Sequence, residues 1–216
     1  MDTKRIADLL APFLCGTSIS TDQLNEVSLY LERLLRWNQR MNLTAIRDPD
    51  QIITRHFGES FFAGMQIMAS EQSITRNAID VGSGAGFPGL PIKILAPWLP
   101  MRLLEAQHRK AIFLREVVRD LDLQKCEVLA ERAEVLVQSK AAVADLVTIR
   151  AVERFENVLP IAAQLTSSKG RLLLLIGREQ VSITLEALPG FRWLPPIPIP
   201  LSASRLILIG SNKEPG

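Results

Sequence analysis

The order of apolar and polar positions divides the chain into two parts. Up to about residue 68, apolar residues recur three and four positions apart, which is the spacing of amphipathic helices. From about residue 77, short runs rich in Val, Ile and Leu alternate with helical segments. Runs without polar alternation indicate strands that are covered on both faces, as in a parallel sheet. The pattern therefore predicts an N-terminal helical segment, residues 1–72, followed by an α/β domain, residues 73–216.

The N-terminal segment is predicted to form three helices, at residues 3–14, at about 22–39 and at 50–68. Ser20 or Thr21 can cap the second helix, and a turn or kink is expected within the third. Opposite its apolar stripe the second helix carries Arg33, Arg36 and Arg40. Such a row is either a solvated face or a set of contacts for nucleic-acid phosphates, and the spacing leaves both interpretations open.

In the α/β domain, strands are expected at about residues 77–82, 101–105, 125–130, 144–149 and 170–176. The helices between them are expected at 89–96, 109–121, 132–138 and 152–167. Two last strands, within 191–198 and 204–209, are predicted to form an antiparallel hairpin at a sheet edge, where their prolines are tolerated. A mostly parallel sheet closed by such a hairpin is the Rossmann-like fold of class I methyltransferases that use S-adenosylmethionine (SAM).

A glycine-rich loop, Asp80 to Gly89, lies where the first buried strand turns into a helix. Glycine allows positive φ and lets a ligand approach the backbone, and a helix start offers free N–H groups. From Gly84 the loop follows G-x-G-x-x-G, the dinucleotide pattern. From Asp80 it follows D-x-G-x-G-x-G, the pattern of SAM methyltransferases. An acid at the strand end suits the cationic groups of SAM and has no partner in a pyrophosphate cradle, so we favour SAM.

Ligands of open α/β sheets bind at the carboxyl ends of the strands. This rule selects Gly82 to Phe87, Glu105, residues 131–134 and Arg150. Glu105 is placed to bind ribose hydroxyls, which both dinucleotides and SAM carry. Arg150 follows an apolar strand and needs an anionic partner. An RNA phosphate, the cofactor carboxylate and a structural ion pair are the candidates.

Composition narrows the function further. The chain has 216 residues and a net charge of +2, so a nucleic-acid surface requires local clusters of basic residues. Cys15 and Cys126 match no metal or redox spacing and are expected to be small buried thiols. With only two histidines, a His-rich metal site is excluded and no metal is expected. Neither a signal peptide nor a membrane span is evident, so we expect a cytoplasmic protein.

The chain resembles the bacterial RsmG family, also called glucose-inhibited division protein B (GidB). The resemblance covers about residues 20 to 210 and is carried by four motifs: Asn42-Leu43-Thr44 with Arg47 and Arg55-His56-Phe57; Asp80 to Pro91; Leu103-Leu104-Glu105 with Arg109-Lys110; and Arg150-Ala151-Val152. The F-P-G-L-P extension of the glycine loop is specific to this family among methyltransferases. Membership implies SAM-dependent methylation of N7 of one guanine in a loop of 16S ribosomal RNA.

The resemblance also implies roles for single residues. Ala133 and Glu134 match positions that contact the adenine end of SAM, although a first-turn carboxylate such as Glu134 also suits the helix dipole. His56 matches a residue beside the cofactor and substrate cleft and is also expected to contact RNA. Phe87 is expected to line the SAM pocket. The arginines proposed to bind RNA phosphates are Arg33, Arg36, Arg40, Arg47 and Arg55.

Five positions depart from the family pattern. Glu59 stands for the usual Asp, and Ile149 and Ile176 stand where Ser and Lys are usual. Arg178 follows closely and can supply the charge missing at residue 176. The order of Lys and Arg is reversed at residues 109–110, with little expected effect.

Methylation at guanine N7 needs alignment rather than a general base, because N7 already carries a free lone pair. The sequence accordingly shows no base–nucleophile pair. The partner expected is 16S RNA, free or within the small ribosomal subunit or its assembly intermediate, and the protein is expected to be a monomer. Two alternatives stay open: a small dinucleotide-dependent oxidoreductase, and a regulator that binds SAM or RNA without catalysis.

Overall fold

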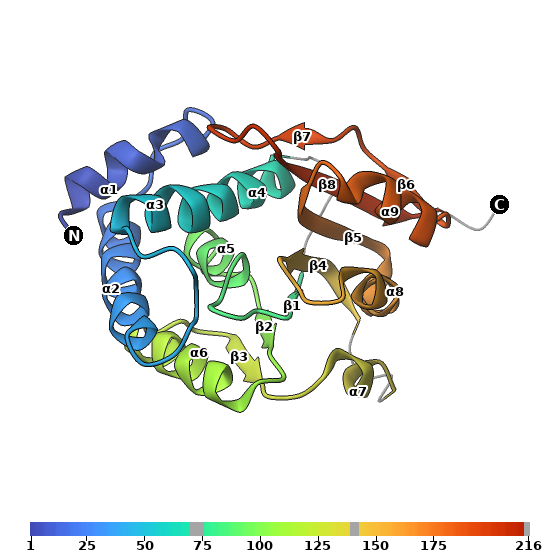
Figure 1. Ribbon diagram of the computed structural model, residues 1–216, viewed down its shortest axis with the longest axis horizontal. Helices are drawn as coiled ribbons and strands as arrows, with labels where there is room; N and C mark the ends of the chain where they lie inside the picture. Colours follow the sequence, from blue (N-terminus) through green and yellow to red (C-terminus); the bar gives the residue numbers. More distant parts are fainter. Residues whose placement is uncertain (70–75, 139–142, 214–216) are drawn as a thin grey trace.

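The computed structural model describes residues 1–69, 76–138 and 143–213, with one mixed sheet between two layers of helices (Figure 1). Its strand order is β3-β2-β1-β4-β5-β8-β6, and β7 also pairs with β8. Neighbours among β1 to β5 are parallel, whereas β8 is antiparallel to β5, β6 and β7. The strands are β1 (Ala78–Val81), β2 (Met101–Leu104), β3 (Cys126–Leu129), β4 (Ala144–Arg150), β5 (Thr166–Gly177), β6 (Phe191–Trp193), β7 (Ile197–Pro198) and β8 (Arg205–Asn212). The predicted fold, including its antiparallel C-terminal edge, is confirmed.

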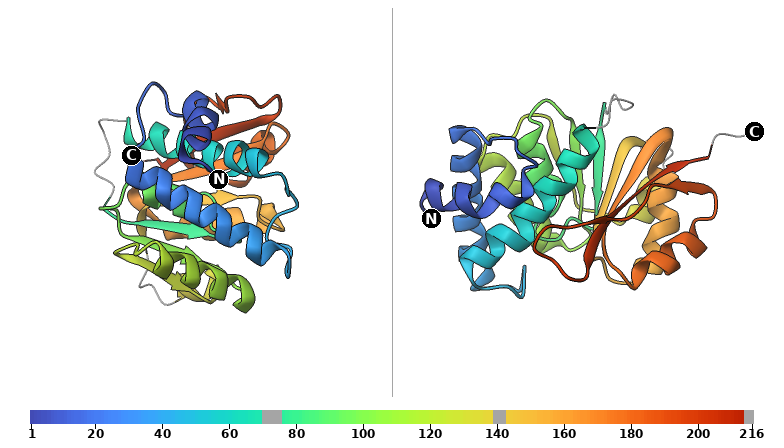
Figure 2. Two further views of the ribbon diagram at one scale, coloured as in Figure 1. Left: turned by 90° about the vertical axis from the view of Figure 1, so that its left-hand side faces the viewer. Right: turned by 90° about the horizontal axis from the view of Figure 1, so that it is seen from above.

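Each face of the sheet is covered by its own set of helices (Figures 1 and 2). One set consists of α1 (Thr3–Leu10), η1 (Ala11–Phe13), α2 (Thr21–Asn38), α3 (Pro49–Ile52), η2 (Ile53–Gly58), α4 (Glu59–Met68), α5 (Gly89–Leu95) and α6 (His108–Asp120). The other consists of α7 (Ala133–Gln138), α8 (Phe155–Leu165) and α9 (Gln180–Ala187). The sheet separates the two apolar clusters because successive residues of a strand point to opposite faces: Leu103 belongs to the first cluster and Leu104 to the second.

The N-terminal helices are built into the main core. Ile6, Val27 and Tyr30 are fully buried in the same apolar cluster as Leu90 of α5 and Ile207 of β8. The expected division between residues 72 and 73 lies outside the described residues. The shared cluster nonetheless means that the N-terminal segment cannot detach from the sheet without exposing apolar surface.

Helix α2 begins where its capping signal predicts. The Ser20 hydroxyl accepts a hydrogen bond from the Gln23 N–H (3.2 Å), and the Gln23 side chain accepts one from the Ser20 N–H (3.0 Å). This reciprocal pair satisfies two backbone donors that the helix start would otherwise leave free. Gln23 also donates to the carbonyl of Ile94 (2.9 Å), which fixes the start of α2 against α5.

The kink predicted in the third helix is a π-helical segment. Asp48 caps α3 by accepting from the Gln51 N–H (2.8 Å), η2 then widens the helix, and α4 continues it. At Gly58 a Cβ atom would lie 2.5 Å from the Phe13 ring, so only glycine allows this approach to η1. Extra-wide turns of this kind re-aim the side chains that they carry. Here η2 carries Arg55 and His56.

Several local expectations differ from the structure. Helix α9 was not predicted, because its hydrophobic residues show little amphipathic spacing. The buried-thiol expectation is wrong for Cys15, which is exposed in a turn with φ 52° before Gly16, and Cys126 is half-buried. Among the described residues, we find no helix with the length and apolar character that a bilayer crossing requires.

Candidate cofactor and substrate site

A cavity of about 690 Å³ opens at the carboxyl ends of β1, β2 and β4, the edge that the strand-end rule selects. Its lining combines five regions that are distant in sequence: the glycine-rich loop, the loop after β2, the loop after β3, the segment from Arg150 to Ile161, and an N-terminal wall. That wall consists of Leu43, Thr44 and His56. The cavity therefore joins a nucleotide-type cradle to residues of the helical segment.

The glycine-rich loop has the backbone that its sequence demands. Gly82, Gly84 and Gly86 have φ values of 68°, 57° and 93°, in the region that favours glycine. A Cβ at Gly82 would lie 2.7 Å from Val152 Cγ1. The Tyr30 hydroxyl donates to the Ala85 carbonyl from below the loop. The backbone thus stays open toward the cavity while α2 supports it from the core.

Glu105 lies where the sequence predicts, after β2 and facing the loop. One carboxylate oxygen accepts from the Gly84 N–H (2.8 Å) and the other from the Gln107 N–H (2.7 Å). The side chain is buried yet lines the cavity. Each oxygen keeps a further lone pair for a ligand hydroxyl, so the structure brings Glu105 and the glycine loop into one cradle.

Asp80 does not reach the cavity, contrary to the expectation that it faces the cofactor. It is fully buried, and its oxygens accept from the Thr148 hydroxyl (2.6 Å) and the Gly89 N–H (3.3 Å). Burial raises the pKa of the Asp80 carboxyl to about 6, with these hydrogen bonds opposing the rise. Its place one residue inside β1 points it into the core, where it joins β4 to the start of α5.

Ala133 and Glu134 begin α7 and line the far end of the cavity. Glu134 is exposed and stands in the first helical turn. The position suits both interpretations from the sequence, contact with a ligand and a favourable place on the helix dipole. Phe87 lines the cavity closer to the N-terminal wall and is largely buried.

Arg150 also lines the cavity, but the anionic partner that the structure gives it is a protein side chain. Its guanidinium donates to the Glu59 carboxylate (3.0 Å), to the Arg55 carbonyl (2.5 Å) and to Nδ1 of His56 (3.2 Å). Burial lowers the pKa of Arg150, and the negative charge of Glu59 opposes this shift. The structural ion pair, one of the three candidate partners from the sequence, is therefore formed with Glu59.

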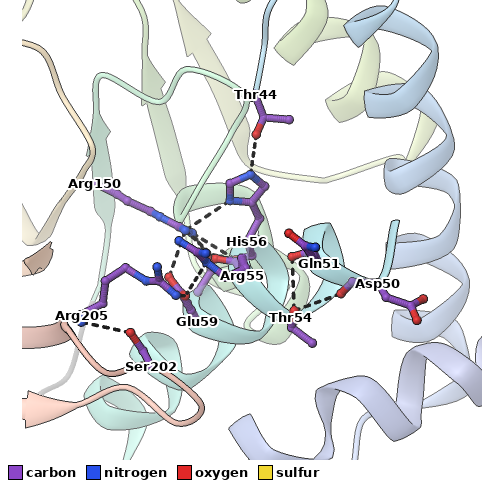
Figure 3. Close-up of polar contacts among 11 residues, drawn as sticks. Thr44, Asp50, Gln51, Thr54, Arg55, His56, Glu59, Arg150, Ser202 and Arg205 are labelled. Atoms are coloured by element: carbon purple, nitrogen blue, oxygen red, sulfur yellow. Dashed lines mark hydrogen bonds and ion pairs between the residues drawn. The ribbon is translucent and has the colours of Figure 1, made fainter. Parts of the chain in front are cut away.

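Sequence reasoning missed the importance of Glu59. Its side chain is 2% exposed and pairs with Arg150, with Arg205 of β8 and with Arg55 at 3.8 Å (Figure 3). One carboxylate thus joins η2, the end of β4 and the C-terminal edge. The available signal was a lone acid between Phe57 and Phe61, a position that burial would favour only with a cationic partner.

His56 packs flat against Phe87, with 4.8 Å between ring centroids, and Phe87 stacks on Tyr30 in turn. Its Nε2 lies 2.7 Å from the Thr44 hydroxyl. Burial first, and then the charges of Arg150, Arg55 and Arg205, lower the pKa of His56 to about 3. The ring is therefore neutral at physiological pH.

The five arginines predicted to contact RNA do not form one row. Arg33 is half-buried and pairs with Asp120 at 2.7 Å, because α2 packs beside α6. The exposed ones are Arg36, Arg40, Arg47 and Arg55. Arg47 donates to the Asn38 carbonyl (2.8 Å) and the Asn42 side chain (3.1 Å). The described lining of the cavity includes none of the five, so any contact they make with RNA lies outside it.

The two apolar departures from the family pattern are core residues. Ile149 and Ile176 are 0% and 3% exposed in the second apolar cluster, and neither lines the described cavity. Arg178 is exposed beyond the end of β5. Within residues 1–69, 76–138 and 143–213, no group of three or more His, Cys, Asp or Glu side chains could hold a metal ion.

Fold and cavity together define a class I methyltransferase. Magnesium protoporphyrin IX methyltransferase from Synechocystis, solved with bound SAM, shares the fold with a TM-score of 0.62 at 12% identity, over 87% of this chain and 97% of that one. The family model for rRNA small subunit methyltransferase G matches residues 23–187. Relatives of that name are 41% identical in Chloroflexus aggregans (76% of this chain, 68% of the relative) and 31% identical in Syntrophotalea carbinolica (98% of each). The chain belongs to the rRNA small subunit methyltransferase G family.

Proposed function

We propose that this methyltransferase transfers the methyl group of SAM to N7 of one guanine in a loop of 16S ribosomal RNA. The observation that carries the proposal is the cavity, in which the glycine loop and Glu105 face the N-terminal wall of Thr44 and His56. One side offers a cradle for a nucleoside. The other offers polar and aromatic groups for a second ligand, and family membership supports RNA as that ligand.

The SAM side is assigned from the lining. Gly82 and Gly84 offer open backbone, Glu105 accepts the ribose hydroxyls, and Ala133 and Glu134 meet the adenine. Phe87 covers the sugar and sulfonium end. Asp80 and Arg150 act indirectly, Asp80 by holding the turn into α5 and Arg150 by holding the N-terminal wall.

When bound, SAM supplies a methyl group on a sulfonium: the N7 lone pair forms the new N–C bond, the C–S bond breaks and its electrons stay on sulfur. The protein need not remove a proton. Its contribution is to hold the base in line with the methyl group and to tolerate the positive charge that N7 gains. Neutral His56 and the hydroxyl of Thr44 suit a site that must leave a nucleophilic nitrogen unprotonated.

The N-terminal segment, residues 1–72, is proposed as the RNA-facing part of a monomeric protein. Arg36, Arg40, Arg47 and Arg55 are exposed there and can contact phosphates around a splayed-out base. Arg33 contributes less, since Asp120 already neutralises it. The substrate is ribosomal RNA, free or in an assembling small subunit, which places the enzyme in the cytoplasm.

The test is transfer of a labelled methyl group from SAM to small-subunit RNA from a strain that lacks the modification. The RNA is given free and as 30S particles, and the product is mapped by cleavage at N7-methylguanine. We expect one labelled guanine. SAM binding without transfer to either substrate would favour a non-catalytic regulator, and binding of NADH in place of SAM would overturn the cofactor assignment.

Two sets of variants refine the test. Glu105→Ala should abolish detectable SAM binding, whereas Glu127→Ala on the exposed side of β3 should leave it unchanged. Joint charge reversal of Arg36 and Arg40 should weaken RNA binding and reduce its salt dependence by about one unit for each phosphate that is no longer neutralised. An unchanged salt dependence would remove α2 from the RNA interface.

A further inference from the structure

A chain of polar contacts runs from the buried carboxylate of Glu59 to the wall of the cavity (Figure 3). Glu59 accepts from Arg150 (3.0 Å), Arg150 donates to Nδ1 of His56 (3.2 Å), and Nε2 of His56 meets the Thr44 hydroxyl (2.7 Å). Thr44, His56 and Arg150 all line the cavity. This series of contacts thus ends at the place where the substrate base is proposed to bind.

The direction of each hydrogen bond in this chain is fixed by arginine. A guanidinium has only donors, so Nδ1 of His56 must present its lone pair to Arg150. A neutral imidazole carries its single proton on the other nitrogen. His56 is therefore the Nε2–H tautomer, and it donates to the oxygen of Thr44.

The Thr44 hydroxyl is left with one hydrogen to donate. Its oxygen accepts from His56 and from the Ile46 N–H (3.1 Å), which occupies both lone pairs. In the part of the chain that the structure describes, no acceptor is bonded to that hydrogen. A threonine hydroxyl ordinarily serves as donor or acceptor, but the network restricts this one to donating toward a ligand in the cavity.

We infer that the Thr44 hydroxyl donates to O6 of the target guanine and thereby selects guanine over adenine; this deepens the proposed function and rests on it. On the base edge that carries N7, guanine presents the acceptors N7 and O6, whereas adenine presents N7 and an amino donor. Because the Thr44 hydroxyl can only donate, it can bond to the acceptor O6 of guanine but not to the adenine amino group, which is itself a donor. A bond to O6 also leaves the N7 lone pair free for the methyl group.

Thr44 is the specificity-determining residue in this arrangement. The positioning residues are Glu59, Arg150 and His56, which restrict the Thr44 hydroxyl to the role of donor. The shape of the site alone would discriminate weakly between two purines. A buried donor left facing another donor discriminates far more strongly, because neither group finds a partner.

The experiment is a double-substitution cycle of enzyme and RNA. RNA with guanine or with 2-aminopurine, which lacks O6 and keeps N7, at the mapped position is given to the wild type and to Thr44→Val. With guanine, T44V should lower kcat/KM roughly 10- to 100-fold. With 2-aminopurine, T44V should cause no further loss, because the bond is already absent. The cycle cancels the intrinsic difference in N7 reactivity between the two bases.

Three controls isolate the hydroxyl. Thr44→Ser keeps the donor and should retain most of the activity. Thr54→Val removes a hydroxyl that donates to the Asp50 carbonyl (3.0 Å) outside the cavity lining, and should leave transfer unchanged. SAM affinity should be equal in all variants. If T44V does not fold, Thr44→Ala takes its place in the same cycle, and equal losses with guanine and 2-aminopurine again overturn the inference.

The outcomes separate this inference from the function it rests on. Absence of N7 methylation of guanine RNA by the wild type means that the proposed function has failed. Methylation by the wild type together with equal losses for T44V on both RNAs means that Thr44 acts without O6. Only a loss confined to guanine supports the inference.

Discussion

Two carboxylates, Asp80 and Glu59, are buried close to the cavity, and their surroundings differ. Asp80 accepts from a hydroxyl and a backbone N–H, and its pKa is raised to about 6 by burial. Glu59 pairs with three arginines that come from three parts of the sequence. With neutral donors, a buried carboxylate holds a turn within one part of the fold and keeps a raised pKa, whereas arginines give it counter-charges and join it to distant segments.

The comparison separates two tasks in the site. Asp80 works within the sheet, from β1 to β4 and the start of α5, and so shapes the cofactor cradle. Glu59 works between elements and holds the N-terminal wall against β4 and β8. Changes at the two positions should therefore differ in size, in pH dependence and in the ligand whose binding suffers.

The largest effect is expected for Glu59→Gln. The variant keeps the shape of the side chain but leaves the buried Arg150 without its counter-charge, which should cost about 3–5 kcal/mol of unfolding free energy. Urea unfolding at neutral pH measures it. Glu32→Gln is the matched control, since Glu32 is 68% exposed and lies 3.8 Å from Arg33, and should cost under about 0.5 kcal/mol. If E59Q lost as little unfolding free energy as the control, Glu59 and its arginines would not stabilise the fold together.

On the Asp80 side, Gly89→Ala is expected to cost about 1–3 kcal/mol of stability. The new Cβ would lie 2.7 Å from both an Asp80 oxygen and Leu103 Cδ2, so the start of α5 must move. Gly190→Ala is the control, because a Cβ there meets nothing within 4 Å. SAM affinity, measured by titration, should fall for G89A alone. Equal stability and equal SAM affinity of the two variants would show that the contact between Asp80 and Gly89 does not hold the turn in place.

These two positions also show what sequence can predict. The alternation of strands and helices, the glycine loop and Glu105 follow from local spacing, and all were found within a few residues of their expected places. Asp80 was assigned to the wrong side of its strand end, because a motif gives the position of a residue and not the direction of its side chain. One residue of strand is enough to exchange core for cavity.

The Glu59 cluster could not be predicted, because its members are joined only by the fold. Arg150 lies 91 residues from Glu59, and no periodicity links either to Arg205. The pairing of Arg33 with Asp120, 87 residues away, was missed for the same reason. Ion pairs across the fold depend on which helices pack together, and this is decided by the core rather than by the charges.

His56 and Asp80 lie near the cavity and have opposite pKa shifts. Each makes the unfolding free energy depend on pH, with opposite sign, and the effect is smaller than those above. Folding lowers the pKa of His56 from 6.5 to about 3, so acidification from about pH 7.5 to about pH 5 favours the unfolded chain, by about 2 kcal/mol. Folding raises the pKa of Asp80 from 3.8 to about 6, so the same change favours the folded chain, by about 1 kcal/mol.

Urea unfolding of three proteins at both pH values tests this pair. The wild type should lose little stability on acidification, because the two shifts oppose each other. Asp80→Asn should lose about 2 kcal/mol, and His56→Gln should gain about 1 kcal/mol. Parallel behaviour of the two variants would contradict the assignment of the shifts.

The smallest effect is expected within the Glu59 cluster, which consists of Glu59, Arg55, Arg150 and Arg205, because its arginines differ in exposure. Arg55 has a side chain that is 47% exposed and lies 3.8 Å from Glu59, whereas Arg150 is 12% exposed and lies at 3.0 Å. Because solvent screens the first pair, Arg55→Met should change the unfolding free energy by less than about 0.5 kcal/mol, and Arg150→Met by several times more. If Arg55 is used for RNA instead, R55M should weaken RNA binding while urea unfolding stays unchanged. Equal losses of stability for R55M and R150M would mean that Glu59 needs all of its arginines, and the RNA assignment of Arg55 would lose its structural basis.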